Sequence, residues 1–243
     1  MQRKRRLRKI SIASFDLDGT LTDISFVDSV WLEGIPSLYA VKHGLTVIDA
    51  KDFVTHEYGK IGRERLEWYD LNYWIKKFEL DASPWEILNS FKQKIGIFPE
   101  AIGALKALRE MGLRLIIVTN ARREFADLEI EKTEIGPYFE RVFSATSDFG
   151  LIKKTPEIYR KVCAICKISP TEMIHVGDDH RFDFEIPTGI GIHAFYLDRT
   201  AKHSGPSVIH TLTELSQELA NQRKKIRQKI SSSSHMRMDQ KRD

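Results

Sequence analysis

The sequence predicts an α/β fold: a doubly wound, Rossmann-like parallel sheet with a smaller, all-helical domain inserted into it. Short apolar runs alternate with helical patterns, which is typical of a parallel sheet covered on both faces. Strand patterns nearly vanish between residues 24 and 96, where all four tryptophans lie. Acidic, hydroxyl and basic side chains directly follow the apolar runs, and ligands bind at that end of the strands in such sheets.

Four apolar runs are predicted to be buried strands. They cover residues 10–15, 113–118, 173–176 and 194–197. Two amphipathic patterns predict helices over residues 99–111 and 155–166. Gly112 follows the first as a helix stop, and Pro156 stands in the first turn of the second.

The change of pattern after the first strand predicts two domains. Residues 1–23 and 97–220 form a discontinuous core, and residues 24–96 form a helical cap whose aromatic side chains mostly pack inside it. The cap leaves the core at the end of the first strand, so we expect it to hang over the catalytic edge of the sheet. Residues 221–243 are polar, basic and without periodicity, and we expect them to be disordered.

Composition limits the class of protein. With 243 residues, 42% hydrophobic and 30% charged, the chain can bury one large or two modest cores. The net charge of +4 reflects Lys/Arg runs at residues 3–9 and 223–227. These runs could bind nucleic acid, but solvated termini are the favoured interpretation, because no aromatic residues interleave with them to stack bases.

The sequence has no pattern of a disulfide framework, a signal peptide or a membrane span. Cys163 and Cys166 form no disulfide framework, and a redox pair or half a zinc site is a minor alternative. The basic N-terminus lacks the apolar core of a signal peptide, and no run approaches the roughly 18 apolar residues of a membrane span. We therefore expect a cytoplasmic protein without a membrane partner; its oligomeric state is not predicted.

The most informative motif is Asp16-Leu17-Asp18-Gly19-Thr20, directly after the first predicted strand. Two carboxylates two residues apart can share one Mg²⁺, which prefers oxygen ligands. Aspartate is also a covalent nucleophile in phosphoryl chemistry. One of the two could therefore attack phosphorus while the other carries the proton of the leaving oxygen.

Two further motifs could hold a phosphate. Thr119-Asn120 follows the second predicted strand and leads into a helix, an arrangement that binds anions, although such a pair is often an ordinary helix cap. Lys153 and Lys154 precede the helix that begins near Pro156, where a lysine can neutralise phosphate charge.

A second acidic cluster follows the predicted strand at 173–176. Asp178 and Asp183 could complete a metal site with the first motif. Asp179 could hold a metal-bound water or point away. His180 is expected to meet solvent or substrate, because Mg²⁺ prefers oxygen to imidazole.

In their order and spacing, these motifs resemble the haloacid dehalogenase (HAD) superfamily of phosphohydrolases, over about residues 10–200. The resemblance implies that Asp16 is the nucleophile and Asp18 the general acid and base. It implies that Thr119 and Asn120 bind the phosphoryl group. The corresponding Mg²⁺ ligands are Asp16, Asp18, Asp178 and Asp183.

The resemblance also selects a lysine. Family members often have Lys-Pro-x-Pro, and Pro156 corresponds to the second proline, so Lys153 aligns with the catalytic lysine. Lys154 replaces the first proline and remains a rival one position along.

Because Asp18 is present, the family resemblance favours hydrolysis of a small-metabolite phosphate ester over dehalogenation. A phosphoryl transferase or mutase with the same residues is an alternative, and a non-catalytic binding protein is a weaker one. Substrate contacts are expected from Arg63 and Arg65 in a glycine-containing cap loop. Arg122 and Arg123 are rival contacts from the core.

Overall fold

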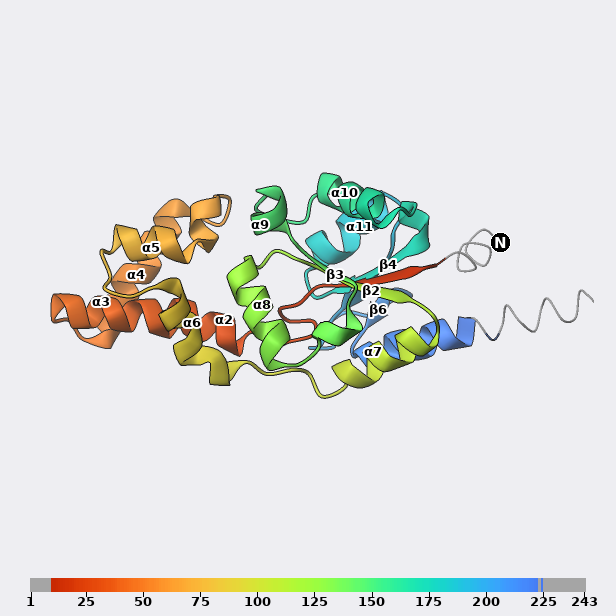
Figure 1. Cartoon of the computed structure of the whole chain (residues 1–243), viewed down its shortest axis with the longest axis horizontal. Coiled ribbons are helices and arrows are strands. Elements are labelled where there is room, and N and C mark those ends of the chain that lie inside the picture. The colour runs from red at the N-terminus through yellow and green to blue at the C-terminus, as the bar shows by residue number, and fades with distance from the viewer. Residues whose placement is uncertain (1–9, 223, 225–243) are drawn as a thin grey trace, which may run out of the picture.

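The computed structural model describes residues 10–222 and 224. Its sheet has six strands in the order β3-β2-β1-β4-β5-β6, and every neighbouring pair is parallel (Figure 1). The strands are β1 (Ile12–Phe15), β2 (Arg114–Thr119), β3 (Arg141–Ser144), β4 (Met173–Gly177), β5 (His193–Leu197) and β6 (Val208–Ile209). The predicted fold class is confirmed.

The four predicted strands correspond to β1, β2, β4 and β5, with ends shifted by up to two residues. The strands β3 and β6 were not predicted. Both lie at edges of the sheet, and they are short and only partly buried, so their apolar signal is weak.

Helices cover both faces of the sheet. Ala13 and Phe15 face a cluster that includes α7, α8 and a helix over residues 212–222. Ile12 faces the opposite side, where α10 packs. Figure 1 shows α7 and the blue C-terminal helix on one side and α10 and α11 on the other. The core helices are α7 (Ala101–Glu110), α8 (Arg123–Lys132), α9 (Ala145–Phe149), α10 (Pro156–Cys166) and α11 (Ile186–Gly189).

Short helical turns complete the core. They are η5 (Gly136–Tyr138), η6 (Pro170–Glu172) and the π-helical turn η7 (His180–Glu185), which runs directly into α11. The sequence places the ends of the longer helices as expected. Gly112 adopts φ 77° just after α7, and the hydroxyl of Thr155 accepts a hydrogen bond from the Ile158 amide at the start of α10.

The segment between β1 and β2 is helical and forms a group of its own at one end of the molecule (Figure 1). Its elements are α2 (Ser25–Ser29), η2 (Val30–Gly34), α3 (Ile35–His43), α4 (Val47–Ile61), η3 (Leu66–Tyr69), α5 (Leu71–Lys77), α6 (Pro84–Phe91) and η4 (Lys92–Lys94). Trp74 is fully buried in its hydrophobic cluster, and Trp31 and Trp68 pack against that cluster. Trp85 is an exception to the expected packing, since 69% of it is exposed.

The two connections to this helical segment lie side by side. The Asp23 amide donates a hydrogen bond to the Gly96 carbonyl, and Thr22 and Ile97 form an antiparallel bridge. Both connections therefore meet the core near the carboxyl end of β1. Phe125 of α8 is the core residue that joins the buried cluster of the helical segment, where it stacks on Trp31.

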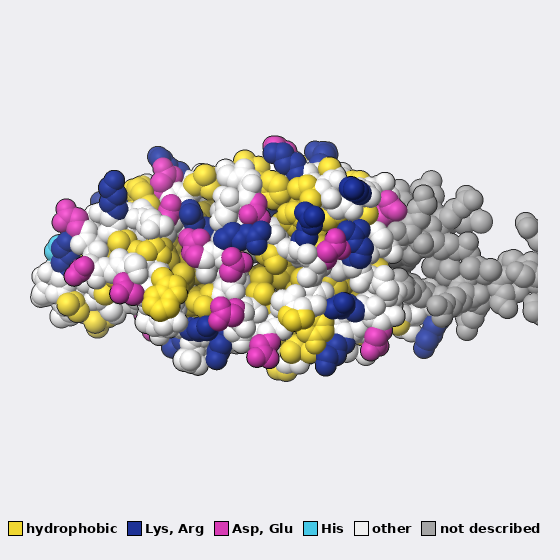
Figure 2. Space-filling model, in the orientation of Figure 1, with side chains coloured by type: hydrophobic (Ala, Val, Ile, Leu, Met, Phe, Trp, Pro, Cys, Tyr) yellow, Lys and Arg dark blue, Asp and Glu magenta, His cyan; other side chains and the backbone are white. Residues whose placement is uncertain are grey.

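Charged side chains of both signs are interspersed over the face drawn in Figure 2. The basic run at 3–9, and the predicted tail apart from residues 221, 222 and 224, lie outside the described residues. Within the part of the chain that is described, no helix is long and apolar enough to cross a bilayer.

Candidate active site

The candidate site lies at the carboxyl ends of the three central strands. Asp16 follows β1, Thr119 ends β2, and Asp178 follows β4. The strand β1 pairs with β2 on one side and β4 on the other, so these residues come together although they are far apart in the sequence. This is the switch point at which parallel sheets place ligands.

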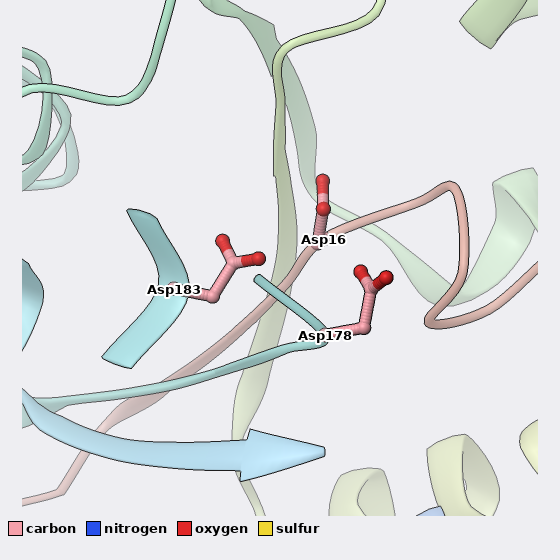
Figure 3. Close-up of side chains that lie close together, drawn as sticks. All are labelled: Asp16, Asp178 and Asp183. Carbon is pink, nitrogen blue, oxygen red and sulfur yellow. The ribbon is translucent and has the colours of Figure 1, made fainter. Parts of the chain in front are cut away.

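Three carboxyl groups meet here. Asp16, Asp178 and Asp183 each offer an oxygen, and these oxygens lie within 4.8 Å of one another. Figure 3 shows Asp183 reaching from the turn after β4 toward the other two side chains. A set of carboxylate oxygens fits Mg²⁺ better than a softer metal. Asp18, which was predicted as a fourth ligand, is not a member of this cluster.

Lys154 is the lysine that contacts the cluster, and the prediction of Lys153 is wrong. The Lys154 ammonium is fully buried and lies 2.9 Å from Asp16 Oδ1 and 2.5 Å from Asp183 Oδ1. Burial opposes its charge, but the Asp16 and Asp183 carboxylates outweigh that cost and raise the pKa of Lys154. The ammonium therefore stays charged beside Asp16.

Lys153 points the other way. Its ammonium pairs with Glu64 of the helical segment at 2.8 Å and lies over the ring of Phe182. The two lysines lie in the loop before α10 and contact different partners, so only Lys154 enters the site. The Lys154 amide donates to Asn120 Oδ1 at 2.8 Å, which fixes this choice. The family pattern Lys-Pro-x-Pro lacks its first proline here. Aligning Pro156 with the second proline therefore placed the catalytic lysine at position 153, one residue too early.

Thr119 and Asn120 make hydrogen bonds to the loops that follow β2 and precede α10. Thr119 is buried, and its hydroxyl accepts a hydrogen bond from the Ala121 amide. The Asn120 side chain is engaged with the Lys154 backbone, as described above. Asn120 thus orients the lysine-bearing segment in this structure.

Two glycines allow the acidic groups to approach the backbone. Gly19 has φ 75°, and a Cβ built there would lie 2.4 Å from Asp178 Oδ2. A Cβ on Gly177 would lie 2.3 Å from Asp183 Cγ. Any side chain at either position would displace a carboxyl group of the cluster.

The pKa values of the three clustered carboxyl groups are shifted in different directions. Desolvation, together with the charges of Asp183 and Asp178, raises the pKa of Asp16 well above its usual value, although the Lys154 ammonium opposes this shift. Desolvation and the charge of Asp183 raise the pKa of Asp178 from 3.8 to about 6, although Asp178 is exposed. Desolvation also acts on Asp183, but Lys154 and His175 outweigh it and lower its pKa. Asp16 and Asp178 have raised pKa values, so a nearby cation would stabilise their ionised forms.

Asp18 faces a different partner, Glu129 of α8, which the sequence analysis missed. The two carboxyl groups lie close enough for each to shift the pKa of the other, and Glu129 Oε2 accepts a hydrogen bond from the Thr22 hydroxyl at 2.6 Å. Glu129 is fully buried, and desolvation followed by the charge of Asp18 raises its pKa well above normal. In the sequence, Glu129 is one of several acidic residues of α8, and only the structure shows that it is buried.

Asp179 and His180 have structural partners. Asp179 Oδ1 accepts hydrogen bonds from the Arg181 and Phe182 amides and caps η7. His180 is exposed and lies 3.5 Å from Glu185.

The arginines predicted to meet substrate already have partners. Arg63 lies over the ring of Trp68, and exposed Arg65 pairs with half-buried Glu67. Arg122 of the core pairs with Asp70 across the boundary with the helical segment, at 3.1 Å. Arg123 pairs with Asp148.

Comparison with known proteins decides the family. The model of the haloacid dehalogenase-like hydrolase family matches residues 10–186. The chain belongs to this family. Like other haloacid dehalogenase-like hydrolases, it is an enzyme of the hydrolase class, and its fold carries the motif residues at the ends of β1, β2 and β4.

Several haloacid dehalogenase-like relatives are phosphatases. The GMP/IMP nucleotidase YrfG of Escherichia coli is 24% identical over 67% of this chain and 72% of its own. The phosphoglycolate phosphatase of Vibrio vulnificus is 29% identical over 82% of this chain and 88% of its own. The crystal structure of a HAD phosphatase from Thermococcus onnurineus is 26% identical, with a TM-score of 0.76, and covers 86% of this chain and 98% of its own.

Proposed function

We propose that this enzyme hydrolyses a small phosphorylated metabolite in a Mg²⁺-dependent reaction through an aspartyl-phosphate on Asp16. The observation that carries the proposal is the contact of Lys154 with Asp16 beside Asp178. A buried carboxylate with a permanent cation on one oxygen is held in a single orientation, as a nucleophile must be for in-line attack.

In the first step, the Asp16 carboxylate attacks phosphorus and the ester oxygen leaves with a proton from Asp18. Desolvation raises the pKa of Asp18, which favours the protonated form that this step requires. In the second step, Asp18 acts as a base toward water, which attacks phosphorus and releases Asp16 and inorganic phosphate.

Positive charge around the transferring group lowers both barriers. Lys154 is the buried cation of the site, and the Thr119 hydroxyl and nearby amides are the neutral donors. Asp16 and Asp178 would hold Mg²⁺, with Asp183 as the third group of the cluster. When bound, Mg²⁺ neutralises charge on the phosphoryl oxygens.

The helical segment 24–96 would act as a cap that excludes water during the first step and selects the leaving group. Two contacts between the segment and the core support this role: Glu64 with Lys153 and Asp70 with Arg122. Arg63, Arg65 and Arg122 are the candidate substrate contacts. From the relatives, we propose nucleoside monophosphates and phosphoglycolate as the first substrates to test.

The test is phosphate release by the purified chain from para-nitrophenyl phosphate, GMP and phosphoglycolate. We expect turnover with Mg²⁺, loss with EDTA, and no turnover by Asp16→Asn under any condition. A transferase or mutase would instead move phosphate to an added acceptor. Absence of turnover with every substrate and metal contradicts the proposal.

A further inference from the structure

Behind the candidate site lies a buried histidine that the proposed mechanism does not use. His175 is in β4 and is fully buried. Its Nε2 lies 3.0 Å from Asp183 Oδ1 and 2.9 Å from the Tyr159 hydroxyl, and its Nδ1 lies 2.9 Å from the Ser14 hydroxyl. Ser14 of β1 and His175 are register partners in adjacent strands, so the ring bridges the two strands that carry Asp16 and Asp178.

The partners determine which nitrogen donates. A carboxylate only accepts hydrogen bonds, so His175 Nε2 carries a hydrogen toward Asp183. The Tyr159 hydroxyl donates to the Phe182 carbonyl at 2.9 Å, which leaves its oxygen as a second acceptor near Nε2. The Ser14 hydroxyl is then free to donate to Nδ1.

Asp183 is held at both of its oxygens. Asp183 Oδ1 contacts His175 Nε2 and the Lys154 ammonium, and Asp183 Oδ2 accepts a hydrogen bond from the Asp179 amide at 3.1 Å. Lys154 in turn contacts Asp16. A continuous series of buried contacts therefore runs from His175 through Asp183 and Lys154 to Asp16. In such a series, the group farthest from the reaction determines the direction in which the nearer groups point.

We propose that His175 is a positioning residue of the hydrolase: its Nε2–H holds Asp183 so that Lys154 stays against Asp16. The proposal rests on the proposed function, because it assigns His175 a role in that reaction. It extends that function to a residue with no contact to the reacting atoms. Its action requires only the hydrogen at Nε2, whereas a space-filling role would require only the shape of the ring.

A matched pair of amide substitutions separates these roles. The side-chain nitrogen of glutamine lies as many bonds from Cα as Nε2 does, and that of asparagine as many as Nδ1. His175→Gln can therefore still donate to Asp183, whereas His175→Asn can reach only toward Ser14. Val162→Ala is the control for lost packing, because Val162 is buried in the hydrophobic cluster that contains Tyr159, a partner of His175, and has no part in the hydrogen-bonded series.

The measurements are kcat and KM for para-nitrophenyl phosphate, with the thermal midpoint of each variant. We expect His175→Asn to lower kcat about 10–100-fold with KM nearly unchanged, the range of effects of groups that orient ligands. His175→Gln should restore kcat to within about threefold of the unmodified enzyme, and Val162→Ala should lower only the midpoint. Equal kcat losses in the two His175 variants, or no loss in either, overturn the proposal.

A second readout does not depend on activity. In protein labelled with ¹⁵N-histidine, the His175 signals are those that vanish in His175→Gln. A hydrogen on Nε2 supports the proposal, and a hydrogen on Nδ1 alone overturns it. If the unmodified enzyme hydrolyses nothing, the proposed function fails, and this spectrum still decides whether His175 donates to Asp183.

Discussion

Asp18 and Glu129 bring two carboxyl groups together, and each shifts the pKa of the other, although 111 positions separate them in the chain. Asp18 Oδ1 and Glu129 Oε1 are buried atoms, and neither accepts a hydrogen bond from an N–H or O–H donor of the described residues. Two carboxylates cannot face each other unless one is protonated, so the pair holds a proton. The contact lowers the pKa of Asp18 and raises that of Glu129, so we infer that Glu129 carries this proton and donates it to Asp18. This bond opposes the effect of desolvation on Asp18.

The first prediction follows from this donor. Glu129→Leu should raise the pKa of Asp18 further, because the donor that stabilises its carboxylate is gone. Asp18 must be ionised to act as a base, so the low-pH limb of the kcat profile should move to higher pH. Glu129→Gln keeps a donor and should leave the limb in place. Profiles that shift alike in the two variants contradict this role for Glu129.

The second prediction concerns the two lysines. Lys154→Ala leaves Asp16 and Asp183 buried without their cation, which costs about 3–5 kcal/mol for a broken buried pair. We expect nearly complete loss of turnover and a lower thermal midpoint. Lys153→Ala removes only an ion pair with exposed Glu64, so turnover of para-nitrophenyl phosphate should stay close to that of the unmodified enzyme. Loss of turnover in Lys153→Ala but not in Lys154→Ala would instead identify Lys153 as the catalytic lysine, as expected from the sequence.

The lysine register illustrates what could be predicted from sequence. The motifs, their order and the three central strands were sufficient to bring Asp16, Thr119 and Asp178 to one edge. The choice between Lys153 and Lys154 depends on how the loop before α10 is oriented toward the site, and apolar periodicity carries no information about that. Glu129 and His175 were missed for a related reason. Their partners are determined by how α8 and β4 pack, not by local spacing.

The third prediction separates the two aspartates of the first motif. Asp16→Asn should abolish turnover, because an amide does not attack phosphorus. Asp18→Asn should lower kcat by roughly 10²–10⁴-fold, the usual contribution of general acid–base catalysis. A fluoride mimic of the phosphoryl group, trapped in a crystal, should have its central atom next to Asp16. Finding it bonded to Asp178 would reverse the assignment.

The fourth prediction links pH and metal. The folded-state pKa of Asp178 is raised to about 6, so protonation of this group favours the folded state at low pH. That contribution is complete only below about pH 4 and is lost as pH rises through about 6, so the metal-free protein should become less stable between about pH 4 and 7. Since Asp178 is exposed, solvent screening should limit the change to a few degrees in thermal midpoint.

Mg²⁺ should reverse this trend, because it binds the ionised form and should stabilise the protein more at pH 7.5 than at pH 5. Thermal midpoints with EDTA or Mg²⁺ across this range provide the measurement, and Asp178→Asn is the control. That variant should lose both the pH effect assigned to Asp178 and most of the response to Mg²⁺. A Mg²⁺ response that is undiminished in Asp178→Asn would remove Asp178 from the metal site.

The last prediction concerns selection of the leaving group by the cap. Arg63→Ala or Arg65→Ala should change the order in which GMP, phosphoglycolate and other monophosphates are preferred. Hydrolysis of para-nitrophenyl phosphate should be nearly unaffected, because that small ester needs only core residues. Arg122→Ala breaks the contact with Asp70 and should weaken closure of the cap, which lowers kcat/KM most for the natural class of substrate.

Arg160→Ala, on the exposed side of α10, is the matched control and should change no ratio between substrates. If Arg63→Ala and Arg65→Ala lower kcat/KM equally for all substrates, the loop serves stability or movement of the cap. If only Arg122→Ala changes the ratios, recognition lies at the Asp70–Arg122 contact, where the core meets the cap. In that case the guanidinium of Arg63 has its role on the face of Trp68, inside the cap.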